Sequence, residues 1–449
     1  MPVTSASKSP PISGWGRYPW QAAQEVFPGS LRDIPALIER PYLPRGQGRS
    51  YGDASLPAPG HLALNSSRLD RFISFDPATG VLEAEAGVTL ERILQVCLPA
   101  GFFLPVTPGT KYVSLGGALA SNVHGKNHHR VGSIEHCVEA MEVLTPAGAF
   151  RCSSDREPAL FRATLGGYGL TGVITAATLR LKPVPSPELD CLRLRARSLE
   201  ELFRLFEKHD PEYEYSVAWL DTLAGGRGLG RGILMLGNHA PAIAGEKSGP
   251  GPRAGRKLRV PFPLPEAFLN GNLLSLFNHT FYRLVKCGKP VREGFEPYFY
   301  PLDRIRDWNL LYGSRGFFQY QCVIPDPRGE QGMAACLRFL SGNRLGAFLS
   351  VLKRCGDDGV MLPFCRRGYT LALDIPFRGK ETLRLLDRLD GIVLEYGGRV
   401  YLTKDARLGP ETFRAMYPEF KPWMDTVRRF NPEGRSSSLL AERLGLWKE

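Results

Sequence analysis

Three glycine-rich segments carry most of the residues that could take part in chemistry. The first covers residues 45–53 and reads RGQGRSYGD. Its alternate glycines, Gly46 and Gly48, allow the backbone to curl so that successive N–H groups face one anion. Arg49 and Ser50 add further hydrogen-bond donors. Taken alone, the segment fits a phosphate-binding loop and an ordinary turn between strands equally well.

The second segment combines small residues with a dense polar cluster. Residues 116–122 read GGALASN, which lets a bulky planar ligand approach the backbone closely, and residues 124–129 read HGKNHH. His124 and His128 stand four residues apart, a spacing that could hold a metal ion on a helix. However, Gly125 disfavours a helix there, and no carboxylate is suitably spaced. We therefore expect no metal site.

The third segment contains a formal dinucleotide-binding pattern, because Gly167, Gly169 and Gly172 have the spacing G-x-G-x-x-G. A Rossmann fold requires a strand before this pattern and a helix after it. Residues 173–181 read VITAATLRL, and this β-branched alternation predicts a strand instead. We therefore reject a Rossmann fold. Three small-residue loops among short strands fit an extended dinucleotide whose pyrophosphate is cradled by loops.

The elements that must position these loops indicate an α+β chain. Short apolar runs separated by Gly and Pro predict strands as far as residue 181, and further strands at 317–324 and 369–375. An amphipathic pattern predicts a helix at 381–396. Residues 224–260 are rich in Gly and Pro and predict a mobile loop. The apolar stretch 264–285 is typical of either a core helix or a membrane-surface helix.

Length and composition limit the protein class. With 449 residues the chain exceeds one ordinary core, so we expect two domains, separated at the PVPSP break of residues 183–187. No apolar run is long enough to span a bilayer, and the amino-terminal residues lack the apolar region of a secretion signal. The net charge of +12 favours anionic ligands, but no nucleic-acid-binding signature accompanies it.

The cysteines indicate a reducing compartment. Their number is nine, which is odd, and no C-x-x-C pair occurs, so neither structural zinc nor a disulfide framework is expected. We expect reduced, partly buried thiols in a cytoplasmic protein.

The glycine-rich segments together resemble the FAD-binding domain of the vanillyl-alcohol-oxidase type and, within it, the decaprenylphosphoryl-β-D-ribose 2′-oxidase family. The motifs that carry this similarity are residues 45–53, 108–129, 167–174 and the YLTKD turn at 401–405. The resemblance implies a two-domain α+β flavoprotein. Residues 1–185 would form the FAD-binding domain, 186–398 a substrate domain with an antiparallel sheet, and 399–449 a segment returning to the FAD domain.

The cofactor that the resemblance implies is FAD. Gln47 stands in the region where many relatives tether the flavin through a histidine, so we expect FAD to be bound non-covalently. The resemblance implies that the cofactor is lined by Arg45, Gly46, Gln47, Gly48, Arg49, Ser50, Tyr51, Gly52, Asp53, Gly109, Ser114, Leu115, Gly116, Gly117, Ser121, Asn122, Val123, His124, Gly172, Val173 and Tyr401.

The resemblance also implies the reacting residues. Lys404 would be the base or proton carrier for alcohol oxidation, with His124 and Tyr51 beside the flavin and the substrate; otherwise Lys404 is a surface lysine paired with Asp405, and His124 a structural residue closing a turn. The residues implied to bind a sugar phosphate are Trp219, Gln319, Gln321, Lys353 and Lys404. The alternatives are that Trp219 only packs in the core and that the two glutamines lie on a solvent-facing strand.

The implied activity is oxidation of the 2-hydroxyl of a polyprenyl-phosphoryl-β-D-ribose to a 2-keto sugar. A short-chain reductase would complete the epimerisation to arabinose for the cell envelope, and a quinone or oxygen would accept the electrons. The alternatives are a soluble sugar, alditol or lactone oxidase on the same scaffold, and a non-catalytic flavin-binding partner subunit. Because polyprenyl phosphates reside in bilayers, residues 227–259 and 264–285 could attach the protein peripherally to the inner face of the plasma membrane.

Overall fold

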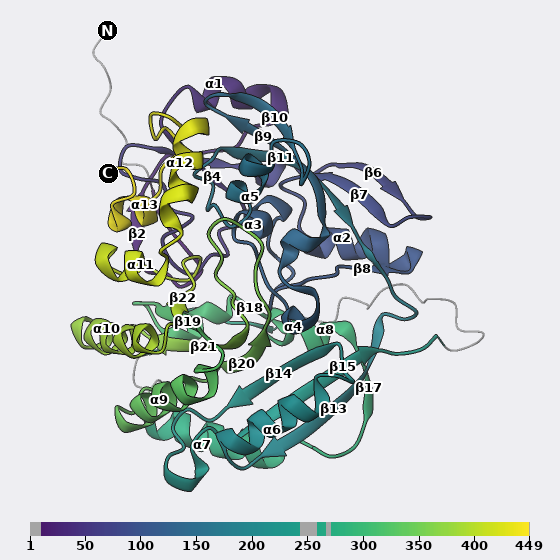
Figure 1. Ribbon diagram of the computed structural model, residues 1–449, viewed down its shortest axis with the longest axis vertical. Helices are drawn as coiled ribbons and strands as arrows, with labels where there is room; N and C mark the ends of the chain where they lie inside the picture. The colour runs from purple at the N-terminus through teal and green to yellow at the C-terminus, as the bar shows by residue number, and fades with distance from the viewer. Residues whose placement is uncertain (1–9, 243–257, 266–270, 449) are drawn as a thin grey trace.

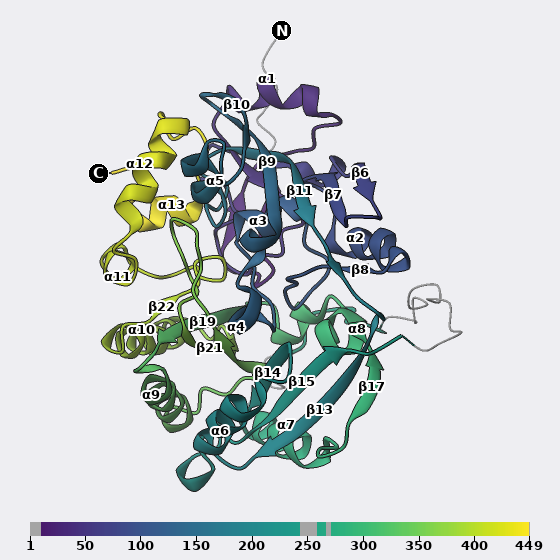
Figure 2. The same cartoon turned by 45° about the vertical axis from the view of Figure 1, so that its right-hand side comes forward.

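The computed structural model describes residues 10–242, 258–265 and 271–448. Figure 1 shows two halves, one above the other, each built around an antiparallel sheet. The upper half contains the strands up to residue 183 together with the yellow helices of the carboxy-terminal segment. The turned view of Figure 2 shows the same division. The predicted α+β class with an antiparallel sheet is therefore confirmed.

The upper half is built on a five-stranded antiparallel sheet in the order β10-β9-β11-β7-β6, and a parallel sheet in the order β3-β5-β4. Its strands are β1 (Pro11–Ser13), β2 (Trp20–Ala22), β3 (Glu25–Val26), β4 (Tyr42–Arg45), β5 (Leu62–Asn65), β6 (Phe72–Asp76), β7 (Val81–Glu85), β8 (Phe102–Phe103), β9 (Val138–Thr145), β10 (Gly148–Cys152), β11 (Val173–Arg180) and β12 (Lys182–Pro183). Because β11 directly follows Gly172, the strand predicted there is confirmed and a Rossmann helix is excluded.

Short helices cover this sheet. They are α1 (Ile34–Ile38), α2 (Leu90–Cys97), α3 (Leu115–Ala120), α4 (His128–Val131) and α5 (Pro158–Thr164). In α2 the apolar residues Leu90, Ile93, Leu94 and Cys97 recur at helical spacing and are all buried, and the hydroxyl of Thr89 accepts the amide N–H of Arg92. Since α4 begins at His128, the HGKNHH motif does not place His124 and His128 on one helix.

The lower half is an eight-stranded antiparallel sheet in the order β17-β13-β15-β14-β20-β21-β19-β22. Its strands are β13 (Glu188–Ala196), β14 (Tyr215–Leu220), β15 (Gly232–His239), β17 (Val291–Gly294), β19 (Phe317–Pro325), β20 (Ser350–Cys355), β21 (Gly368–Pro376) and β22 (Arg399–Val400), with β16 (Leu258–Arg259) and β18 (Ile305–Arg306) paired separately. Its helices are α6 (Leu199–His209), α7 (Gly271–Leu284), α8 (Phe295–Phe299), α9 (Gly329–Gly342) and α10 (Lys380–Glu395).

The loop predicted at 224–260 is wrong at residues 232–239. Residues 232–239 form β15, which lies between β13 and β14 inside the eight-stranded sheet. The apolar run containing Ile233, Leu234 and Leu236 is buried, and this burial outweighs the surrounding glycines. Residues 243–257 lie outside the described part of the chain. Of the predicted stretch 264–285, residues 266–270 are likewise outside it, and α7 accounts for most of the rest.

The carboxy-terminal segment crosses back to the upper half, as Figures 1 and 2 both show. Its helices are α11 (Pro410–Met416), α12 (Phe420–Phe430) and α13 (Leu439–Leu444). The indole N–H of Trp423 donates to the carbonyl of Ala163 at 3.1 Å, and the side-chain amide of Asn431 donates to the carbonyl of Leu170 at 2.8 Å. The division of the chain at residues 185 and 398 remains a prediction, and these contacts agree with the predicted return.

Candidate functional site

One face of the eight-stranded sheet carries a row of polar side chains. In the ladder of β19 with β21, Gln319 is opposite Asp374 and Gln321 is opposite Ala372, while Lys353 of β20 is opposite Thr370. Because residues in register point to the same side of a sheet, these side chains share one face. The intervening residues face α9 and α10 and form an apolar core that includes Tyr320, Cys322, Leu352, Leu371 and Leu373.

The glutamines on this face are not exposed to solvent. Gln319 is 4% exposed and Gln321 is 1% exposed, so the alternative of a solvent-facing strand is wrong for both. The segments of the upper half that were predicted to surround the flavin cover them. A buried amide must find partners: Gln319 finds Asp374 of β21, and Gln321 finds Thr370 of β21 and His124 of the upper half.

His124 is joined directly to this polar face. The side-chain amide of Gln321 donates to Nε2 of His124 at 2.9 Å and to the hydroxyl of Thr370 at 2.9 Å. His124 is therefore a neutral imidazole with its proton on Nδ1. Burial, followed by the charge of Lys353, holds the pKa of His124 well below its usual range. Neither Nδ1 of His124 nor Oε1 of Gln321 has a partner among the described residues, as expected where a ligand completes the site.

Lys404 lies in the turn that follows β22. The backbone N–H of Lys404 donates to the carbonyl of Tyr401 at 3.0 Å, and its ammonium lies 5.4 Å from the centre of the Tyr51 ring. Burial and the nearby charge of Lys353 lower the pKa of Lys404 to about 7, although Asp374 partly opposes this shift. Asp405 pairs instead with Arg443 at 2.9 Å, so the alternative of a surface Lys404–Asp405 pair is wrong.

A base with this pKa predicts a specific pH dependence. If Lys404 accepts the proton of an alcohol, it must be neutral, so the rate of flavin reduction should rise with pH and level off above about 7. His124 should not add a second step, because its pKa lies well below this range. Anaerobic stopped-flow reduction between about pH 5 and 9 measures the profile. A flat profile, with FAD remaining bound at every pH, would contradict a role for Lys404 as the base.

The first glycine-rich loop offers a set of free amide groups. Within the described chain, the backbone N–H groups of residues 47–52 have no acceptor in the protein, whereas the carbonyls of Ser50 and Tyr51 accept the amides of Trp15 and Gly16. A Cβ atom at Gly52 would lie 1.8 Å from the carbonyl oxygen of Asp405, so only glycine fits this approach. Such a run of N–H groups without protein acceptors suits the pyrophosphate of FAD.

Two predicted cofactor residues support this loop from inside the protein. The guanidinium of Arg45 donates at 2.8 Å to the carbonyls of Ser13 and Ser55. The carboxylate of Asp53 accepts both Nε and a terminal nitrogen of Arg443, at 2.8 and 2.9 Å. Both side chains are buried and already paired, so their place is behind the loop. Arg49, in contrast, lies over the ring of Trp15, 4.0 Å from its centre.

The second glycine-rich segment brings the carboxy-terminal turn to the upper half. Ser114 caps α3, and a Cβ atom at Gly116 would come within 2.8 Å of the side chain of Ala86. The hydroxyl of Tyr401 donates to the carbonyl of Ser121 at 2.5 Å, and its ring lies 5.2 Å from that of His124. The structure thus gathers Tyr51, His124, Gln321 and the 401–405 turn around one region.

The remaining predicted residues lie further along the same elements. Of the cofactor residues, Leu115 and Gly117 lie in α3, the side-chain amide of Asn122 donates to Glu135 at 2.7 Å, and Gly172 and Val173 lie where β11 begins.

Trp219, predicted to bind the substrate, lies on β14. Its indole N–H donates to the carbonyl of Phe348 at 3.4 Å, and its ring contacts Phe281 of α7. These contacts fit the alternative that Trp219 only packs in the core. Its strand, β14, is the neighbour of β20, which carries Lys353.

Asp374 was not singled out from the sequence as a site residue. Its carboxylate accepts the side-chain amide of Gln319 at 2.6 Å and the hydroxyl of Tyr312 at 3.2 Å. Burial raises the pKa of Asp374 to about 6, and the positive charge of Lys404 partly opposes this rise. The usable signal was the alternation in β21, where Thr370 and Asp374 are polar positions among leucines.

Lys126, inside the HGKNHH motif, was also missed. Its ammonium contacts the carbonyl of Tyr298 and lies 4.2 Å from the centre of that ring. Burial and then Lys353 lower the pKa of Lys126 to about 7. The motif was noted for its histidines, and only the packing against Tyr298 shows that this lysine is enclosed.

Comparison with known proteins places the chain among flavoproteins. Residues 24–153 match the FAD binding domain family. The whole chain is 32% identical over 455 residues to decaprenylphosphoryl-β-D-ribose oxidase of Mycolicibacterium smegmatis, covering 97% of each chain. An uncharacterized protein of Streptomyces coelicolor is 33% identical over 80% of this chain and 100% of its own length. D-arabinono-1,4-lactone oxidase of Yarrowia lipolytica is 25% identical over 40% of this chain and 36% of its own.

Proposed function

The chain belongs to the decaprenylphosphoryl-β-D-ribose oxidase family, and on this premise we propose that it oxidises the 2-hydroxyl of a polyprenyl-phosphoryl-β-D-ribose to a ketone. The family confirms the predicted FAD cofactor and an oxidoreductase acting on CH–OH groups. The observation that carries the proposal is the placement of Lys404, a half-buried lysine whose ammonium lies 5.4 Å from the centre of the Tyr51 ring and close enough to His124 and Asp374 to interact with their charges. The exact sugar lipid and the onward conversion to arabinose by a reductase belong to this proposal.

The residues present fit the cofactor. The backbone amides of residues 47–52, which lack acceptors in the described chain, would hold the pyrophosphate, and the Tyr401–His124 region would border the flavin ring. Bound FAD supplies the hydride acceptor for alcohol oxidation. Gln47 leaves the first loop without a tethering histidine, so FAD should be released when the protein is denatured.

The protein's own groups account for proton removal and substrate binding. Nζ of Lys404 takes the proton of the 2-hydroxyl, and the neighbouring carboxylate of Asp374 stabilises the ammonium that results. Nδ1–H of His124 and Oε1 of Gln321, both buried without partners in the described chain, hydrogen-bond the sugar. Lys353, which donates to the carbonyl of Gly125 at 3.3 Å, offers charge to the phosphodiester.

Anaerobic flavin reduction by a panel of alcohols tests this function. A lipid-linked phosphoribose should bleach the flavin, whereas free ribose, alditols and sugar lactones should not. Bleaching by free sugars or lactones alone would instead establish the second candidate, a sugar or lactone oxidase; the partial similarity to D-arabinono-1,4-lactone oxidase is what favours that candidate. Bleaching by none of these alcohols would contradict both.

We also propose that α7 attaches the protein to the membrane that holds this substrate. In the described residues no helix is long and apolar enough to cross a bilayer. On α7, Leu276 is 63% and Leu284 is 74% exposed, and the basic residues Arg283, Lys286 and Lys289 are exposed nearby. Exposed leucines beside lysines and arginines are typical of a surface that inserts into anionic lipid.

Vesicle sedimentation measures this attachment. The wild-type protein should co-sediment with vesicles containing anionic lipid, and less so at high salt, since charge attraction is screened. Leu276→Glu together with Leu284→Glu should lower the bound fraction about tenfold or more. The matched control is Ile73→Glu on β6, because Ile73 is also exposed, at 52%, but lies in the upper half. Equal loss in both variants, or no binding by the wild type, would contradict attachment through α7.

A further inference from the structure

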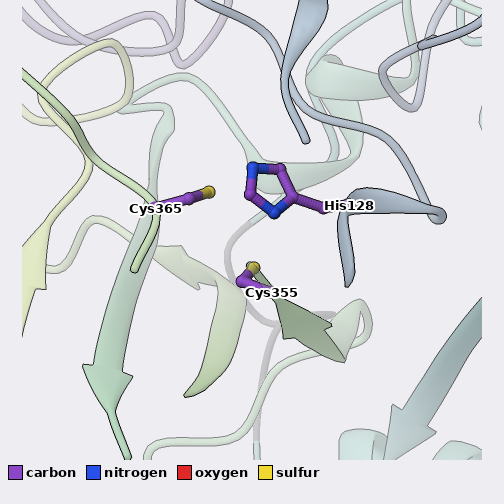
Figure 3. Close-up of side chains that lie close together, drawn as sticks. All are labelled: His128, Cys355 and Cys365. Carbon is purple, nitrogen blue, oxygen red and sulfur yellow. The ribbon is translucent and has the colours of Figure 1, made fainter. Parts of the chain in front are cut away.

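Three buried side chains from distant parts of the sequence converge beside the polar face, at the end of β20. They are His128 at the start of α4, Cys355 at the end of β20 and Cys365 in the loop before β21. Figure 3 shows both sulfur atoms and the imidazole ring pointing toward one another. Their candidate ligand atoms all lie within 4.8 Å of one another, and each of the three residues is at most 2% exposed.

The hydrogen bonds around His128 fix its orientation and tautomer. Nε2 lies 2.9 Å from Oδ1 of Asp358, which also accepts the hydroxyl of Ser133 at 2.6 Å. The backbone N–H of Gly356 donates to Nδ1 at 3.0 Å, so Nδ1 carries a lone pair and Nε2 carries the proton. A carboxylate that holds the far nitrogen of a histidine is the usual support for a metal-binding imidazole.

The same carboxylate also holds the backbone that carries one of the thiols. The other oxygen of Asp358, Oδ2, accepts the backbone N–H of Cys365 at 2.8 Å. Asp358 therefore connects the histidine to the loop that carries one sulfur, while Gly356 connects it to the strand that carries the other. Figure 3 shows one ring nitrogen of His128 directed toward the sulfur of Cys355. The site is thus organised before any ligand arrives.

We propose that Nδ1 of His128 and the Sγ atoms of Cys355 and Cys365 bind one thiophilic metal ion, with Zn²⁺ as its representative. Thiolate and imidazole are the ligands that such ions prefer, and three protein ligands leave a fourth position for water. Binding releases the two thiol protons. The lone pair of Nδ1, which accepts the N–H of Gly356 when the site is empty, then binds the metal instead. Two thiolates then balance the charge of a divalent ion, which suits a buried site.

This site is separate from the proposed oxidation chemistry. The rings of His124 and His128 are 6.1 Å apart, edge to face, and His124 is the one bonded to Gln321. A bound ion would instead fasten the loop between β20 and β21 to α4. Among the residues described, no other group of three His, Cys, Asp or Glu side chains brings its ligand atoms together in this way.

The expectation of no metal site was based on the segment around His124 and His128, with Gly125 between them and no suitably spaced carboxylate, and on the absence of a C-x-x-C pair. The histidine that converges with the cysteines is His128, and its partners lie more than 220 residues further along the chain. A second pair of buried cysteines, Cys322 and Cys336, interacts through its thiols. Within the described residues this pair has no third His, Cys, Asp or Glu ligand close enough to complete a metal site. This pair therefore provides a matched control.

Metal content tests the proposal on the FAD-loaded protein kept reduced with a phosphine. After treatment with a chelator and dialysis against Zn²⁺, the wild type should retain about one ion per chain by elemental analysis. With Co²⁺ it should show d–d bands at wavelengths longer than those of the flavin, of the strength expected for tetrahedral thiolate ligation. Zn²⁺ should also raise the midpoint of thermal unfolding.

The variants separate this site from other thiols. Cys355→Ala and Cys365→Ala should each lose at least about tenfold in Zn²⁺ affinity and lose the Co²⁺ bands, whereas Cys336→Ala should match the wild type. The flavin spectrum of each variant reports whether it has folded; if either variant fails to fold, the wild-type measurements and the other variant decide. Absence of Zn²⁺ from the reduced wild type, or equal loss in Cys336→Ala, would overturn the proposal. So would a Cys355–Cys365 disulfide in air-exposed protein whose reduced form binds no metal.

Discussion

The Lys404→Ala protein should keep FAD bound but be reduced by the lipid-linked sugar about 10²–10⁴-fold more slowly than the wild type. This is the range expected when a positioned base is removed. Lys404 is suited to the role because burial and Lys353 bring its pKa to about 7, so that much of it is neutral near physiological pH. Anaerobic stopped-flow absorbance of the flavin measures the rate.

Two controls make the Lys404 result specific. Lys421→Ala removes an exposed lysine of α12 and should leave the rate unchanged. Lys404→Arg keeps a positive charge but not a group that can be neutral near pH 7, so it should remain slow and lose the rise of rate with pH. If Lys404→Ala is reduced within about threefold of the wild-type rate, another group removes the proton.

The Arg443→Met protein should lose about 3–5 kcal/mol of its free energy of unfolding, together with affinity for FAD. Arg443 lies between two buried carboxylates, pairing with Asp53 in the first glycine-rich loop and with Asp405 next to Lys404. Burial already raises the pKa of Asp53, and Arg443 opposes that rise. Without the guanidinium, Asp53 is left as an unpaired buried charge or must take up a proton.

Urea denaturation followed by flavin fluorescence and circular dichroism measures both effects. The matched control is Arg435→Met, which breaks a 2.7 Å pair with Glu433 on the surface of the same segment. A surface pair contributes about 0–1 kcal/mol, so this variant should stay close to the wild type. Similar losses in the two variants would show that the buried Arg443 pairs do not anchor the first loop to the carboxy-terminal segment.

Local patterns in the sequence were sufficient for many of the elements. The amphipathic spacing of α2 and α10 and the β-branched run of β11 each lie within a window of fewer than twenty residues. The strand β15 was missed because its apolar run is short and surrounded by glycines that suggest a loop. Only its place between β13 and β14, where both neighbours hydrogen-bond to it, makes a strand there stable.

The sequence by itself predicted the glycine-rich loops and the strand after Gly172 from residue type and short spacing, whereas FAD as the ligand was predicted from the family resemblance. Tertiary structure alone decided which side chains meet. Gln319 and Asp374 are 55 residues apart, and His128 and Asp358 are 230 apart. Such pairs depend on the register of strands and the return of the carboxy-terminal segment, which no local pattern contains. The same packing shields Lys404 from much of the solvent and thereby lowers its pKa.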